Sequence, residues 1–471
     1  MHIPTPFITA ALAVSVSAHP TKEALTSQIC RRDTKIWSFE NVPMTSSLHT
    51  RRALPPDNFF GTPKSIPAVF KGTAEVGPPE GGKVFQESAH FRVYDAQSTT
   101  QATKTLAMME AAYDCFVNDM KFRTSGLSFN AESDEGYTGP FYKENIYGKA
   151  SMPGAAGVMN TNMTLGMSYV QVLADFLDDP TITVHEFGHA LTYHEKGWVN
   201  QGNTGVFWEP IAEWFADTYI TSDLCAAARA RGKQPKGDTI IDLDRIISGS
   251  PAVIVDGTTP APNNNYYQSW PFFAYITNNP DEIEGLGNFA VRNLFRAFKA
   301  GSQETPLHTI AYITTTPVRE IVAKYWARMA FVDIGHDIAA ALYKDLRKRF
   351  NYANLDAIGS TGTYKPKVGR MPKYFGANII PLKATGKTIG VEITAQKAFI
   401  ATLVVKKGTV VSYVSCPGGA CTAPVGDEAM LVIVNAPEEL MKYDGFAISR
   451  AANEGLNYEL KLTGAKAKAK A

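Results

Sequence analysis

Residues 185–189 read His-Glu-Phe-Gly-His, and this short segment holds the side chains best suited to chemistry. The two histidines are four residues apart, so in a helix they lie on one face and can reach a single ion. Neutral imidazole is a zinc ligand, and catalytic zinc sites use three protein ligands and a water. Glu186 would stand beside that water, where its carboxylate can act as a general base. The segment predicts a hydrolytic zinc site with His185 and His189 as ligands.

Two helices must position these side chains. The first is predicted over 180–195, with Asp179 as its N-cap. His194 lies on a different face from His189 and is interpreted as a helix-end residue. The second helix is predicted over 208–223. It carries three acids four residues apart, which is unusual in so apolar a segment: Glu209, Glu213 and Asp217.

HEFGHAL followed by WEPIAEWFAD resembles the gluzincin zinc metallopeptidases, the superfamily of thermolysin-like and aminopeptidase-N-like enzymes. The resemblance implies that a glutamate on the second helix is the third zinc ligand, and Glu209 matches that position. It implies that Glu213 orients a zinc-bound histidine. The alternative shifts the assignment by one turn, with Glu213 as ligand and Asp217 behind it. The chain is also similar to secreted fungal proteins that carry HEFGH ahead of a C-terminal β domain.

The resemblance further implies an electrophile that stabilises the oxyanion of the tetrahedral intermediate. Aminopeptidase-like members use a tyrosine on a later helix, and thermolysin-like members use a histidine. In the stretch YYQSWPFFAYI, Tyr266 is the first candidate and Tyr267 the second. Aromatic packing is the alternative role for both. His308 and His336 are weaker candidates.

The expected fold class is α+β, with a mostly helical zincin-like domain followed by a β-sandwich-like domain. A strand is predicted over 89–95 and Gly-rich loops over 135–165. Further helices are predicted over 98–120, 168–177, 267–277, 283–299, 305–312, 317–331 and 335–349. The predicted segments are a signal peptide (1–18), a pro-segment or irregular region (19–88), the zincin-like domain (89–350), a linker (351–378), the sandwich-like domain (379–464) and a disordered tail (465–471).

Composition and the N-terminus favour a secreted protein. The chain has 46 Lys and Arg against 45 Asp and Glu, a balance that argues against general nucleic-acid binding. An apolar run ends in Val16-Ser17-Ala18, which predicts a signal peptide cleaved after Ala18. The run is too short to cross a membrane, and no other stretch is suited to do so. Arg31-Arg32 and Arg51-Arg52 are either processing sites or ordinary exposed charge.

Secretion permits disulfides. Cys416 and Cys421 bracket a Pro-Gly-Gly-Ala turn, so a bridge between them is expected, and Cys115 can pair with Cys225. Cys30 is left over. Asn162 begins the sequon Asn-Met-Thr and is a candidate N-glycan acceptor.

The leading prediction is a secreted zinc metallopeptidase acting on protein or peptide substrates. Endopeptidase is preferred, because the aminopeptidase Gly-x-Met-x-Asn strand is missing from the sequence. The runner-up is a secreted binding protein, directed for example at carbohydrate, whose zinc site is structural or degenerate. Glu186 argues against it, since a structural zinc needs no base. A third possibility is a zinc hydrolase acting on a non-peptide bond.

Overall fold

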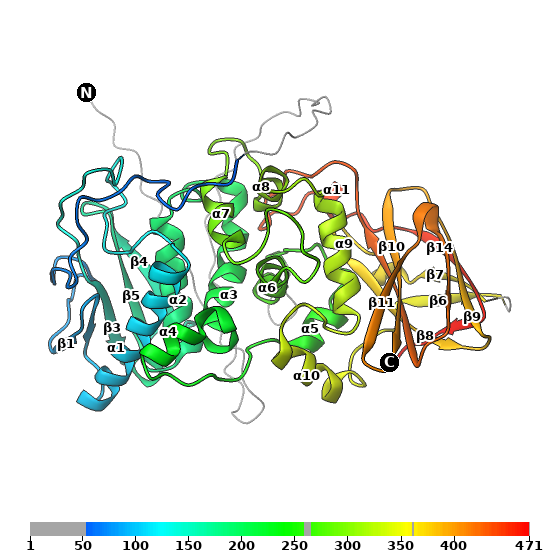
Figure 1. Cartoon of the computed structure of the whole chain (residues 1–471), viewed down its shortest axis with the longest axis horizontal. Helices are drawn as coiled ribbons and strands as arrows, with labels where there is room; N and C mark the ends of the chain where they lie inside the picture. Colours follow the sequence, from blue (N-terminus) through cyan, green and yellow to red (C-terminus); the bar gives the residue numbers. More distant parts are fainter. Residues whose placement is uncertain (1–52, 259–264, 360–361, 471) are drawn as a thin grey trace. The chain divides into compact units, whose positions relative to one another are not determined.

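The structure is a computed structural model, and it describes residues 53–258, 265–359 and 362–470. The predicted signal peptide, both dibasic pairs and Cys30 lie outside the described residues. Helices and sheets both make up large parts of the chain, so its class is α+β (Figure 1). None of the helices in the described ranges is long and apolar enough to cross a membrane.

The chain divides into two compact units. The first contains Pro56–Lys196 and Phe215–Lys236, and the second contains Gly197–Trp214 and Gly237–Ala471. Helix α3 (Trp208–Thr221) begins in the second unit and ends in the first. The predicted zincin-like domain, 89–350, therefore contributes residues to both units.

The first unit is built on a five-stranded sheet with strand order β1-β2-β3-β5-β4. Strands β2, β3 and β5 are parallel, and the edge strands β1 and β4 are antiparallel to their neighbours. Helix α1 contacts β2, α2 contacts β4 and β5, and the two helices contact each other, so both cover one face of the sheet (Figure 1). The elements are β1 (Phe85–Glu87), β2 (Phe91–Tyr94), α1 (Thr99–Tyr113), a π-helical segment η1 (Asp114–Asp119), β3 (Glu144–Lys149), β4 (Gly157–Asn162), β5 (Met167–Leu173), α2 (Pro180–His194) and α4 (Ala226–Arg231).

The helix predicted over 168–177 is wrong, because this segment forms strand β5. Its sequence MSYVQVL places side chains alternately on the two faces, and Val170 and Val172 are fully buried. Pairing with β3 on one side and β4 on the other satisfies its backbone. The Gly-rich loops predicted over 135–165 are likewise interrupted by β3 and β4.

The second unit begins with helices that pack in sequence order. Contacts join α6 to α7, α7 to α8 and α8 to α9, and α5 contacts α10. Helices α6 to α10 match the predicted ones in order, although most are shorter, whereas α5 was not predicted. Their bounds are α5 (Leu243–Ser248), α6 (Trp270–Asn278), α7 (Ala290–Arg296), α8 (Pro306–Ile313), α9 (Val318–Met329) and α10 (Asp337–Leu346), with a short α11 (Arg450–Asn453) further on.

Two antiparallel five-stranded sheets follow, with orders β11-β10-β13-β8-β15 and β12-β9-β14-β7-β6. Side chains from both sheets share one hydrophobic core. Strands β8 and β13 are buried on both faces because α9 covers the face turned away from that core. The strands are β6 (Leu355–Ile358), β7 (Thr363–Pro366), β8 (Ala377–Ala384), β9 (Thr388–Ala395), β10 (Phe399–Lys407), β11 (Val410–Ser415), β12 (Ala420–Pro424), β13 (Glu428–Asn435), β14 (Tyr458–Thr463) and β15 (Ala465–Ala467).

The C-terminal tail differs from the prediction of disorder. Ala465–Ala467 form strand β15, which pairs with β8. The small side chain of Ala465 is buried in the core shared by the two sheets. Alternation of alanine and lysine therefore fits an edge strand, with alanine turned inward and Lys466 exposed.

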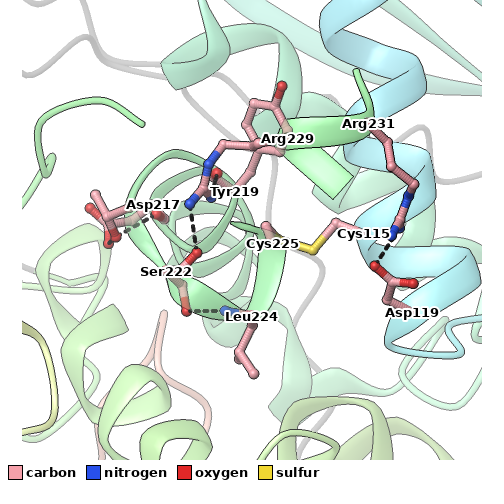
Figure 2. Close-up of a disulfide and its surroundings, with 10 residues drawn as sticks. Cys115, Asp119, Asp217, Tyr219, Ser222, Leu224, Cys225, Arg229 and Arg231 are labelled. Atoms are coloured by element: carbon pink, nitrogen blue, oxygen red, sulfur yellow. Dashed lines mark hydrogen bonds and ion pairs between the residues drawn. A yellow bond between two sulfur atoms is a disulfide. The ribbon is translucent and has the colours of Figure 1, made fainter. Parts of the chain in front are cut away.

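Both disulfides expected from the sequence are present. Cys115 bonds to Cys225 across 110 residues, and Cys416 bonds to Cys421. The first bridge joins η1 to the turn after α3, and Figure 2 shows polar contacts beside it. There Arg229 donates to the carbonyl of Ser222 at 2.9 Å. Two disulfides fit an extracellular protein.

Candidate metal centre

Helix α2 presents the motif from a well-defined start. The Asp179 side chain accepts a hydrogen bond from the backbone N–H of Thr181 at 2.9 Å, and Pro180 occupies the first helical position. The predicted helix is therefore confirmed. His185, Glu186 and His189 all lie within it and have no exposed surface.

Two glycines let other elements approach this helix closely. A Cβ atom added at Gly188 would lie 2.8 Å from the Phe215 ring of α3. A Cβ atom added at Gly157, at the start of β4, would lie 2.7 Å from Oε1 of Glu186. The absence of a side chain at Gly157 thus leaves room for the Glu186 carboxylate against the edge strand of the sheet.

The structure brings His185, His189 and Glu209 together. Each offers one ligand atom, and these atoms all lie within 4.8 Å of one another. All three side chains are buried. In a tetrahedral zinc site, ligand atoms 2.0–2.1 Å from the ion are about 3.3 Å apart, so only small side-chain movements would be needed. Two imidazoles and one carboxylate also match the donor preferences of zinc, so the residues fit a metal ion of this kind.

The other two acids of α3 are outside this group. Glu213 is partly exposed, one turn beyond Glu209. Asp217 is buried and its Oδ2 accepts a hydrogen bond from the Thr221 hydroxyl at 2.9 Å. The geometry therefore favours Glu209 over Glu213 as the third ligand.

Tyr266 and Tyr267 lie close enough to Glu209 for its carboxylate to raise the pKa of both phenols. Burial raises the pKa of Tyr266 to about 12, and the Glu209 carboxylate adds to this rise. Burial and the same carboxylate raise the pKa of Tyr267 well above its usual range. The two rings pack with centroids 4.4 Å apart. Tyr267 is buried whereas Tyr266 is partly exposed, so the Tyr266 phenol is the more accessible proton donor.

The histidines considered as alternative electrophiles have local structural contacts. Nδ1 of His308 accepts from the backbone N–H of Thr305 at 3.2 Å in a capping box of α8. Nδ1 of His336 accepts from the backbone N–H of Ala339 at 3.2 Å and caps α10. These contacts favour helix capping over catalysis for both.

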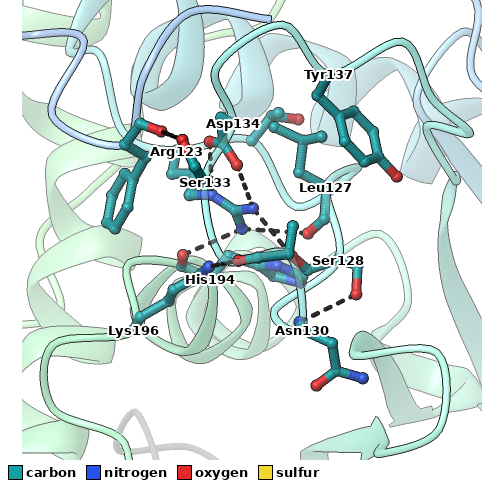
Figure 3. Close-up of polar contacts among 12 residues, drawn as sticks. Arg123, Leu127, Ser128, Asn130, Ser133, Asp134, Tyr137, His194 and Lys196 are labelled. Carbon is teal, nitrogen blue, oxygen red and sulfur yellow. Dashed lines mark hydrogen bonds and ion pairs between the residues drawn. The ribbon is translucent and has the colours of Figure 1, made fainter.

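Sequence reasoning missed the polar contacts that hold the end of α2. Arg123 binds Asp134 through two hydrogen bonds of 2.8 and 2.7 Å, and this ion pair is buried (Figure 3). Its guanidinium also donates to the carbonyls of Leu127, Ser128 and His194 at 3.2, 2.9 and 3.3 Å. Arginine can therefore satisfy the carbonyls left unpaired at a helix end. The two charged residues lie far from α2 in sequence, so no local pattern could have indicated the contact.

No protein-family model matches the chain, and no curated protein matches it.

Proposed function

We propose that the chain is a secreted zinc-dependent metallopeptidase of the gluzincin type, with a zincin-like arrangement around α2 and α3 and a sandwich-like C-terminal region. The buried group of His185, His189 and Glu209 carries this proposal. Glu186 follows the first histidine on the same helix, in the order that a hydrolytic zinc site requires. Tyr266, near Glu209, completes the set as the candidate electrophile, and Glu213 is the candidate for orienting a histidine.

A zinc ion held by these three residues would act as a Lewis acid and would lower the pKa of a bound water molecule towards about 7. Glu186 would accept a proton from the attacking water on a carboxylate oxygen and then deliver it to the nitrogen of the leaving amine. The Tyr266 phenol, whose raised pKa keeps it protonated at neutral pH, would donate a hydrogen bond to the developing oxyanion.

The edge of the sheet supports a peptide as the substrate. Strand β4 ends the strand order of its sheet, so none of the described strands pairs with its outer edge. The strand starts at Gly157, beside the Glu186 carboxylate. An extended peptide can add to such an edge through main-chain hydrogen bonds. We favour an endopeptidase, because the sequence lacks the strand motif that captures a free N-terminus in aminopeptidases.

The second candidate is a secreted binding protein, for example one directed at carbohydrate, with a structural zinc. Burial favours it, because His185, His189 and Glu186 have no exposed surface and structural zinc sites are closed.

The two candidates are separated by metal content and casein hydrolysis of wild type and Glu186→Gln. Glu110→Gln, a half-buried glutamate on α1 that pairs with His90, serves as the control. One zinc per molecule in all three proteins, with hydrolysis lost only in Glu186→Gln, is expected for the peptidase. Zinc in all three without hydrolysis would favour the binding protein. Protein purified without chelators and containing no zinc would refute the metal site.

A further inference from the structure

Three buried side chains connect the sheet of the first unit to the last turn of α2. Glu144 on β3, Ser168 on β5 and His194 on α2 have no exposed surface. The Ser168 Oγ atom lies 2.7 Å from Oε2 of Glu144 and 2.9 Å from Nε2 of His194. Glu144 therefore reaches the metal-bearing helix through one hydroxyl group.

The hydroxyl has one proton, so Ser168 can donate to only one of its two partners and must accept from the other. In one arrangement His194 donates to Ser168, and Ser168 donates to an ionised Glu144. In the other a protonated Glu144 donates to Ser168, and Ser168 donates to a neutral His194. The two arrangements differ by the proton on Glu144 and by which ring nitrogen of His194 carries its proton.

The surroundings favour the protonated form. The hydroxyls of Ser168 and Ser125 hydrogen-bond to the Glu144 carboxyl, and no cation is among the groups that shift its pKa. A fully buried carboxylate without a cationic partner is costly. Burial accordingly raises the pKa of Glu144 to about 8, although the two serines oppose the rise.

The charged and titratable groups around the network do not change this conclusion. The Arg123 guanidinium contacts the carbonyl of His194 but is paired with Asp134. Burial lowers the pKa of His194 well below its usual range, and the positive charges of Arg123 and Lys196 lower it further. Burial raises the pKa of Tyr193 to about 12, and an ionised Glu144 would raise it further. His194 and Tyr193 are thus neutral near pH 7.

We infer that Glu144 carries a proton in the folded protein at neutral pH, and that the resulting hydrogen bonds from Glu144 through Ser168 to His194 position the C-terminal turn of the helix that bears His185 and His189. Glu144 and Ser168 are positioning residues in this scheme. The proton assignment is independent of the proposed peptidase activity, whereas the effect on the metal ligands rests on the proposed site.

The sign of the pH effect follows from the raised pKa. Between about pH 5 and 8 the folded protein keeps the Glu144 proton and the unfolded chain loses it. The folded state then binds more protons, so stability falls as pH rises through this window and levels off above about 8. One proton corresponds to a tenfold rise in the unfolding equilibrium constant per pH unit.

The test compares urea unfolding of the full chain between pH 5.5 and 9, for wild type, Glu144→Gln and Glu110→Gln, with zinc and again with EDTA. Glutamine imitates the neutral acid. Below pH 8 the slope of the unfolding free energy against pH should therefore be smaller in Glu144→Gln than in wild type, by the contribution of one proton, both with zinc and with EDTA. Glu110→Gln should keep the wild-type slope, because the His90 contact holds the pKa of Glu110 low and it stays ionised throughout. Equal slopes in all three proteins would overturn the proton assignment. Infrared spectra of wild type at pH 6.5 test it without a variant, since a protonated carboxyl band is expected and its absence would contradict the inference.

The positioning role needs a separate readout. Zinc affinity is measured by chelator competition at pH 7 and pH 9. Wild type should bind zinc more weakly at pH 9, relative to Glu144→Gln, by about tenfold, the lower end of what removal of a supporting contact costs. Ser168→Ala should weaken zinc at pH 7 while keeping the wild-type slope of stability. If zinc affinity is the same in all variants while the stability slope changes, the proton is confirmed and the positioning role is wrong. Absence of zinc binding in every variant would instead count against the metal centre.

Discussion

One helical turn separates Glu209 from Glu213, and this turn determines which carboxylate can meet a metal ion. Glu209 is buried together with the two histidines, whereas Glu213 is partly exposed and outside their group. Glu209→Gln should therefore lose zinc, since a neutral amide oxygen is a poor replacement for a carboxylate ligand. Glu213→Gln should weaken zinc by only about 10–100-fold, as is typical of a residue that orients a ligand. Chelator competition measures both, and the reverse order would establish the assignment shifted by one turn.

Tyr266 and Tyr267 are adjacent in sequence but differ in exposure, which makes them a matched pair. Tyr266→Phe removes the more accessible phenol and should lower kcat for casein peptides by about 10²–10³-fold, as for loss of one oxyanion donor. Tyr267→Phe should lower kcat by less than tenfold, because this ring is packed in the interior. Zinc content should not change in either variant. Equal losses of kcat in the two would assign both rings to packing alone.

At the scale of elements, the helices and strands that could be predicted are those whose signals lie within a few neighbouring residues. The start of α2 was predictable because Asp179 and Pro180 form a capping signal within a few residues, and the strand-rich C-terminal region was predictable from its short β-branched runs. The segment that forms β5 was misassigned because an apolar run of this length is ambiguous between helix and strand. Its strand identity is decided by pairing with β3 and β4, which no local pattern contains.

The candidate site shows the same limit. The motif residues of α2 and the acids of α3 could be found from spacing and resemblance. The supporting contacts could not, because Glu144, Ser168 and Arg123 meet α2 only through the sheet and loops of the folded unit. The sequence shows only that a polar residue lies within a strand. Its burial becomes apparent only with the fold.

Gly188 tests how closely α2 and α3 must pack. Alanine favours a helix over glycine by about 1 kcal/mol. Its Cβ atom, however, would lie 2.8–3.0 Å from three atoms of the buried Phe215 side chain, and overpacking of this kind costs about 1–3 kcal/mol. Gly188→Ala should therefore lower stability and weaken zinc binding together, measured by urea unfolding and chelator competition. A more stable variant with unchanged zinc affinity would show that the helices have room to separate.

At the scale of the whole molecule, charge is distributed unevenly along the chain. Residues 351–471 contain fifteen Lys and Arg against nine Asp and Glu, although the complete sequence is nearly balanced. The lysines of β15 and its neighbour β8 are exposed, and Lys466 lies opposite Lys383 in the pairing register. Charged side chains on an edge strand oppose further strand pairing, so these lysines disfavour pairing of β15 with a strand of another molecule.

The two disulfides should contribute very differently to stability. Cys115 and Cys225 are 110 residues apart, and the enclosed segment contains α2 and most of the candidate metal centre. Cys416 and Cys421 enclose a single turn with a separation of five. In the chain-entropy description these loops contribute about 5 and about 2 kcal/mol respectively, because the longer loop removes more freedom from the unfolded chain.

Replacing Cys115 and Cys225 together by serine should lower the free energy of unfolding by the larger amount and reduce zinc retention at 37 °C. The matched Cys416→Ser, Cys421→Ser variant should lose less stability and retain its zinc. Comparable losses in both would mean that native contacts, rather than loop closure, account for the stabilisation by the long-range bridge.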